Sequence, residues 1–440
     1  MADPAGCHIL AVMGSGETSP TMVTVHRALV ARLGMDRPRA VLLETPYRFQ
    51  ENADDISARA VAYFARSVGV DVSVLAGMRP AAGNGDGDGD GADRPGSDGG
   101  AGVVRAADWV FSGPGSPTFA LAQWAGSPLA GALRDRLLAG RGITVIASAA
   151  AVTLGLAALP VYEIYKVGAP PHWLDGLDLM SALGLKVAVI PHYDNAEGGN
   201  HDTRYCYLGE RRLSRLEREL PDDAAVLGVD EHTVAVFDLD AGSAEISGRG
   251  GVTVRRRGAS TILPAGTVIT LVQLQDLVSR DTPWRAAPAT PGTAGQQQAA
   301  ATAGRVAAQT LPDITVAAQR RFEAAERDRD AGGMVAAILD LDAAIHDWSA
   351  DTEEDQGTEQ SRAVLRSLIT RLGRVAQDGL RDPRERLAPA VERLITLRGA
   401  LRDGGSYQTA DAIRDALAAA GLQLRDGTDG TGWALEPQSG

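Results

Sequence analysis

The sequence predicts an α/β fold with a doubly wound, mostly parallel sheet, followed by a mainly helical C-terminal domain with a small α+β end. The first observation is that residues 8–77 alternate between apolar runs and amphipathic stretches. The second is the β-branched run 143–146, which is typical of a buried parallel strand. The third is that apolar residues recur at helical spacing after residue 313. Alternating strands and helices predict a parallel sheet covered on both faces.

The predicted elements follow from these patterns in chain order. We expect early strands at 8–13, 40–44 and 70–75, separated by helices at 21–33 and 54–67. Strands are also expected after Asp108, at 143–146 and at 186–191. A helix near 205–220 precedes short strands at 225–229, 234–239, 252–256 and 267–272.

The composition changes twice along the chain and predicts the domain boundaries. Residues 78–104 are acidic and glycine-rich, which predicts a disordered loop inserted in the first domain. Residues 284–312 are rich in Pro, Ala and Gln and predict a linker. We therefore expect an α/β domain at 1–283 and a helical domain at 313–440.

Composition and charge exclude several classes of function. The 440 residues carry a net charge of −13 and only two cysteines, Cys7 and Cys206, too few to frame a zinc ribbon. No apolar run approaches a membrane span, and no signal segment opens the chain. We therefore expect a cytoplasmic protein with no metal, no cofactor and no membrane partner. The oligomeric state is not predicted.

Ser148 occupies the most informative position in the chain. It follows the buried strand 143–146 and precedes an alanine-rich segment typical of a helix. At such a sharp strand-to-helix turn the hydroxyl projects from the carboxyl edge of the sheet, where α/β proteins bind ligands. The alternative is that a small residue is needed here for close packing of strand and helix.

Four segments in order carry a resemblance to a known family. They are the turn Gly113–Pro117 with the elbow Ser148-Ala-Ala-Ala, then Ile190-Pro-His192-Tyr-Asp-Asn, Arg211-Arg-Leu-Ser-Arg215-Leu and Gly228-Val-Asp-Glu231-His-Thr-Val-Ala. Together they resemble the cyanophycinase/dipeptidase E serine peptidases, over about residues 8–275. This resemblance implies a class I glutamine amidotransferase-like fold. The elbow carries serine rather than the cysteine of a glutamine amidotransferase.

The resemblance also implies roles for individual residues. Ser148 would be the nucleophile and His192 the base that takes its proton, with His201 as the fallback. The acidic third member would be Glu163, although an ion pair with Lys166 is the alternative. The amides of Gly115 and Ala149 would stabilise an oxyanion. Two departures, Pro114 and Ala150, remove a backbone donor and narrow the elbow.

Members of this family act on acidic peptides, which predicts a pocket that binds an anionic substrate. Arg204 and Asn195 could line it, and Glu17, after the first strand, would face the same edge. For the arginines near 211–215 the alternative is a solvated helix paired with its own glutamates.

The C-terminal part carries a second resemblance. Arg398, Arg402 and the run Ala410-Asp-Ala-Ile-Arg-Asp415 precede Gly421 and Asp426-Gly-Thr-Asp-Gly-Thr-Gly-Trp433. Residues 313–435 resemble the C-terminal, anticodon-side region of cysteinyl-tRNA synthetase. The catalytic signatures of that enzyme are missing, so amino-acid activation is not expected.

Contact with tRNA through this region stays open beside a structural or protein-docking role. Residues 311–440 hold 16 arginines, no lysine and 23 acidic residues, which argues against strong non-specific binding of phosphates. The leading hypothesis is a serine hydrolase that cleaves a peptide or amide bond. The rival is a non-hydrolytic tRNA- or protein-binding protein with a degenerate α/β pocket.

Overall fold

The computed structural model describes residues 7–75, 100–198, 201–279, 310–348, 355–380, 383–427 and 430–435. The chain forms two compact units. The first comprises residues 1–318 and 339–362, and the second comprises 319–338 and 363–440. Most of the expected loop at 78–104 and most of the expected linker at 284–312 lie outside the described residues. The domain boundaries at 283 and 313 stay a prediction.

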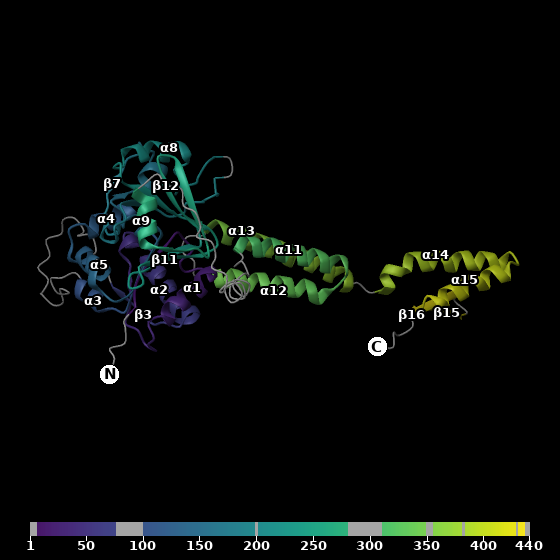
Figure 1. Cartoon of the computed structure of the whole chain (residues 1–440). Helices are drawn as coiled ribbons and strands as arrows, with labels where there is room; N and C mark the ends of the chain where they lie inside the picture. Colours follow the sequence, from purple (N-terminus) through teal and green to yellow (C-terminus); the bar gives the residue numbers. More distant parts are fainter. Residues whose placement is uncertain are drawn as a thin grey trace, which may run out of the picture. The chain divides into compact units, whose positions relative to one another are not determined.

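An eight-stranded mixed sheet organises the first unit (Figure 1). Its order is β14-β11-β10-β1-β5-β4-β2-β3, and the five strands from β1 to β3 in that order are parallel. The strands are β1 (His8–Met13), β2 (Ala40–Leu43), β3 (Val72–Leu75), β4 (Trp109–Ser112), β5 (Gly142–Ala147), β10 (Thr233–Asp238), β11 (Ser243–Gly248) and β14 (Val268–Thr270). The expected α/β class with a mostly parallel sheet is confirmed.

Helices cover both faces of this sheet because alternate residues of its strands point to opposite sides. In β1, Ile9 and Ala11 join one buried cluster and Leu10 and Val12 join another. The first cluster includes residues of α1 and α2, and the second includes residues of α3, α4 and α5. These helices are α1 (Val23–Ala31), α2 (Ala53–Tyr63), α3 (Ala101–Ala106), α4 (Pro117–Trp124) and α5 (Pro128–Ala139).

A second, four-stranded sheet packs into the cluster on the α5 face. Its order is β13-β12-β9-β8, in which only β8 and β9 are parallel. The strands are β8 (Val187–Ile190), β9 (Ala225–Val229), β12 (Gly251–Arg256) and β13 (Ala259–Pro264). The remaining elements around the two sheets are α6 (Ser148–Val152), β6 (Ala157–Ala158), α7 (Val161–Tyr165), β7 (Leu174–Asp175), α8 (Glu210–Leu216) and α9 (Leu271–Ser279).

Among the described residues, five short helical segments also belong to the first unit. They are η1 (Pro20–Met22), η2 (Thr45–Tyr47), η3 (Phe64–Val68), η4 (Met180–Leu183) and η5 (Glu217–Glu219). The expected loop at 78–104 extends too far at its C-terminal end, because 101–104 belong to α3.

From Thr310 onward the chain is mainly helical, as expected. The elements are α11 (Leu311–Arg327), α12 (Ala331–Trp348), α13 (Asp355–Leu380), α14 (Pro383–Asp403), α15 (Tyr407–Ala419) and the hairpin β15 (Leu422–Gly427) and β16 (Gly430–Leu435). Val391, Leu417 and Trp433 form a small core where the hairpin meets α14 and α15. The hairpin is the expected α+β end. Across the described residues, no helix combines the length and apolarity that a membrane crossing requires.

Candidate active site

Ser148 lies at a sharp bend between β5 and α6. Its φ of 45° is in the left-handed region that serine rarely occupies. A hydrogen bond ties this turn to the end of the neighbouring strand β4, because the Ala150 amide donates to the Gly113 carbonyl at 3.2 Å. Ala150 and Ala151 are wholly buried in the core, so small side chains allow α6 to pack closely here. A strained residue at the carboxyl edge of a sheet is typical of a nucleophile elbow.

His192 contacts the Ser148 hydroxyl directly. The histidine follows β8, also with a positive φ of 48°, and its Nε2 lies 3.1 Å from Ser148 Oγ. His201, the alternative base, is exposed, and its backbone amide donates to the Gly198 carbonyl in a local turn. The geometry therefore favours His192 as the group that takes the serine proton.

The carboxylate on the far side of the imidazole belongs to Glu231. Its Oε1 lies 3.0 Å from His192 Nδ1 and also accepts a hydrogen bond from Asn195 Nδ2 at 3.0 Å. The Glu231 amide donates to Asp194 Oδ1 at 2.7 Å. Burial raises the pKa of Glu231, but the hydrogen bonds from His192 and Asn195 and the charges of His192 and His232 hold it below its ordinary value. Glu231 is therefore ionised at neutral pH.

Glu163, expected as the third member, does not occupy that position. It lies on α7, and its Oε2 is buried without a hydrogen-bond partner in the described part of the chain. The reason is topological. Strands β8 and β9 are parallel, with Ile190 opposite Gly228, so the residues that follow each strand meet at one edge. That register brings Glu231 to His192 across a separation of 39 residues.

Gly115 and Ala149, the expected oxyanion donors, both line a cavity that contains Ser148 and His192. Gly115 has a φ of 132°, and a Cβ there would come within 2.1 Å of the Pro46 carbonyl oxygen. Only glycine fits this turn. Ala149 directly follows the elbow serine, the position whose amide faces the reacting carbonyl in nucleophile elbows.

The cavity has a volume of about 450 Å³ and a mixed lining. Two cationic side chains, Arg59 and Lys166, line it together with one carboxylate, Glu197. Lys166 Nζ lies 4.6 Å from the centroid of the Tyr162 ring. The hydroxyl of Tyr207 donates to Glu197 Oε2 at 2.7 Å, so the carboxylate is engaged by a wall residue.

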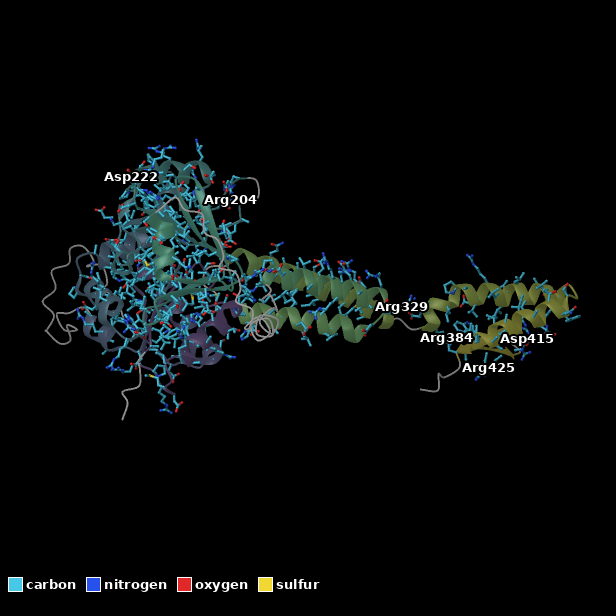
Figure 2. The ribbon with its side chains drawn as sticks, in the orientation of Figure 1. Arg204, Asp222, Arg329, Arg384, Asp415 and Arg425 are labelled. Atoms are coloured by element: carbon cyan, nitrogen blue, oxygen red, sulfur yellow. The ribbon has the colours of Figure 1, made fainter. Side chains whose placement is uncertain are left out.

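The three residues expected to bind substrate lie elsewhere. Arg204 is exposed, as Figure 2 shows. Its guanidinium forms a two-point ion pair with Asp202. Asn195 is fully buried, and its amide donates to the Glu231 carboxylate instead. Glu17 is buried below Gly113, where a Cβ would come 2.5 Å from Glu17 Oε1. None of the three is among the described residues that line the cavity.

The arginine-rich helix α8 fits its alternative better than a substrate pocket. Arg215 pairs with Glu219 at 3.8 Å within the helical segment. Glu210 instead receives the guanidinium of Arg255, a buried residue of β12 that pattern reasoning did not single out. Its signal in the sequence was weak, because Arg255 stands beside Arg256 at the end of the strand.

Comparisons with known proteins return two protein classes. No family model matches the chain. A solved structure of a peptidase from an acI-B1 Actinobacterium covers 60% of this chain and 97% of that chain, with a TM-score of 0.46 and 18% identity.

Among curated proteins the chain is similar to cysteine--tRNA ligases. Identity is 27% over 119 residues to that of Thermosipho melanesiensis, 36% over 96 residues to that of Parvibaculum lavamentivorans and 32% over 151 residues to that of Geobacter sulfurreducens. The matches cover 27%, 20% and 30% of this chain and 25%, 20% and 30% of those proteins. The chain therefore spans less than a third of the length of these curated relatives. The similarity to cysteine--tRNA ligases lies on the C-terminal side of the chain.

Proposed function

We propose that this protein is a serine hydrolase that cleaves a peptide or amide bond through an acyl-enzyme on Ser148. The observation that carries this proposal is the continuous relay of contacts from Ser148 Oγ through both nitrogens of His192 to Glu231 Oε1. Serine, imidazole and carboxylate in this order form the arrangement that makes a hydroxyl nucleophilic.

The reaction follows from these contacts. His192 Nε2 takes the Ser148 proton while Oγ attacks the scissile carbonyl carbon. Glu231 holds the ring with Nδ1 protonated and stabilises the imidazolium that forms. The carbonyl oxygen becomes an oxyanion, which the amides of Gly115 and Ala149 would stabilise. His192 then gives its proton to the leaving amine, and water releases the acyl group by the same steps.

We propose an acidic peptide as the preferred substrate. Arg59 and Lys166 are the cationic side chains of the cavity, and Glu197 is engaged by Tyr207. A substrate carboxylate would therefore meet two cations and one already bonded carboxylate. Charge-assisted contacts of this kind select carboxylates over neutral groups.

The test of the hydrolase proposal uses a fluorophosphonate probe, which reacts only with activated serines, and a set of short peptides. Wild-type protein should be labelled and should hydrolyse acidic peptides, and Ser148→Ala should lose both activities. Lys166→Ala should raise KM for acidic peptides and leave neutral peptides unchanged. Labelling that persists in Ser148→Ala would refute the proposal.

The rival function is tRNA binding through residues 313–435, which the similarity to cysteine--tRNA ligases favours. One feature weakens it. The guanidinium of Arg398 is buried and bonded at two points to Asp426, which also lies 3.9 Å from Arg414. The same carboxylate thus neutralises Arg398 and lies near Arg414, two arginines of the region that would contact tRNA. Retention of tRNA on a filter, together with no labelling of Ser148, would favour this rival.

A further inference from the structure

His232, the residue after Glu231, is held in a tight enclosure. Its side chain is buried, and its φ of 52° is in the left-handed region. The ring Nδ1 lies 2.9 Å from Thr21 Oγ1 and 3.4 Å from Ser19 Oγ. A Cβ on Gly16 would come within 2.1 Å of that nitrogen. The ring therefore fits one position, and its backbone is fixed with it.

Another side of the enclosure is formed by an aromatic residue of the helical region, Trp348. Trp348 is the last residue of α12 and is 2% exposed. Its ring centroid lies 5.7 Å from that of His232 at an interplanar angle of 78°, an edge-to-face contact. The segment that contributes this residue belongs to the first unit, although α12 begins in the second.

The turn that carries Glu231 is fixed by backbone contacts on both sides of His232. The Arg249 amide donates to the His232 carbonyl at 3.0 Å, and the Thr233 hydroxyl donates to the Glu231 carbonyl at 3.1 Å. Because these contacts tie the backbone of His232 to that of Glu231, a displacement of the His232 backbone displaces Glu231 as well. In its protonated form, the His232 imidazolium also lowers the pKa of Glu231 through space.

We propose that Trp348 is a positioning residue for the Ser148–His192–Glu231 triad and acts through the ring of His232. The inference rests on the proposed hydrolase function and goes beyond it, because it makes the end of α12 a requirement for hydrolysis. It also gives the helical region a role in the activity of the α/β domain. Without Trp348 the His232 ring can occupy more than one position. The hydrogen bond between Glu231 and His192 Nδ1 is then no longer held in a single geometry.

The test compares Trp348→Ala with Trp348→Phe and with a matched control, Ile345→Ala, which removes buried apolar volume from the same helix. Trp348→Ala should lower kcat by about tenfold or more with KM nearly unchanged, whereas Trp348→Phe should restore most of the activity. Ile345→Ala should keep kcat within about twofold while lowering Tm. Equal kcat losses in the two alanine variants would overturn the proposal.

Two further measurements separate this inference from the hydrolase proposal. The low-field proton resonance of His192 Nδ1–H reports its bond to Glu231 without any substrate, and Trp348→Ala should weaken or abolish it. A resonance that is unchanged in this variant would refute positioning, even if the wild-type protein hydrolyses nothing. His232→Asn keeps a residue that tolerates the left-handed backbone but removes the ring. Its effect should not add to that of Trp348→Ala, and full additivity would exclude His232 as the intermediary.

Discussion

Replacement of Glu231 by glutamine should separate the orientation of His192 from the negative charge of the carboxylate. The separation is possible because one oxygen of Glu231 contacts both His192 and Asn195. Oε1 lies 3.0 Å from His192 Nδ1 and accepts from Asn195 Nδ2 at the same distance. In Glu231→Gln the carbonyl oxygen can take this place, because Asn195 donates to it and would repel an amide nitrogen. The His192 tautomer is then kept, and only the negative charge is lost.

The size of the loss follows from the charge that is removed. Two unit charges about 4 Å apart attract by about 4 kcal/mol at an effective dielectric constant of about 20. At about 1.4 kcal/mol per tenfold change in rate, kcat/KM should fall by about 10³-fold in Glu231→Gln. Glu231→Ala loses the orientation of His192 as well and should approach a loss of about 10⁴-fold.

The assay is the rate of peptide hydrolysis or of fluorophosphonate labelling across a set of variants. Asn195→Ala in the Glu231→Gln background frees the amide to rotate toward Nδ1 and should cost about another tenfold. Glu163→Gln is the matched control and should stay within about twofold of wild type. Equal losses in Glu231→Gln and Glu231→Ala would refute the assignment of the shared oxygen.

Three further predictions concern stability. Gly115→Ala should lower the free energy of unfolding in urea by more than about 2 kcal/mol, because the new Cβ would clash with the Pro46 carbonyl. The control Gly126→Ala, also at positive φ but in open space, should lower it by only about 1 kcal/mol. Full burial lowers the pKa of His26 to about 4. The neutral ring therefore contributes to the free energy of unfolding above pH 6.5, and this contribution is lost as the pH falls toward 4. This loss should be about 3 kcal/mol and absent in His26→Gln; an identical pH dependence of the two proteins would contradict it. Arg398→Ala leaves Asp426 without its two-point partner and should lower the Tm of the C-terminal unit, with a cost of about 1–2 kcal/mol; an unchanged Tm would show that the pair is dispensable.

Local patterns were sufficient to predict the parallel strands and the elbow. The apolar run before Ser148 forms β5 because β-branched residues favour a strand buried on both faces. Strands β11 and β13 were not predicted. β11 exposes Glu245 and β13 buries only Leu263, so neither strand has the buried apolar run of the central strands.

The site residues that directly follow a predicted strand could be predicted from the sequence. Ser148 and His192 both follow such strands. Glu231 also follows one, yet Glu163 was expected in its place because distance along the chain gives no information about which strands become neighbours. The pairing of β8 with β9 decides the contact. Arg204 and Asn195 were expected in a pocket from residue type alone. Instead Arg204 is held by Asp202, two residues away, and Asn195 by Glu231, which this pairing brings close.

The measurement that tests the central claim most directly is a crystal structure of the protein after reaction with a fluorophosphonate. We predict phosphorus bonded to Ser148 Oγ, a phosphoryl oxygen within hydrogen-bond distance of the Gly115 and Ala149 amides, and His192 held between the adduct and Glu231. An adduct on another residue, or on Ser148 with His192 turned away from Glu231, would contradict the proposed triad.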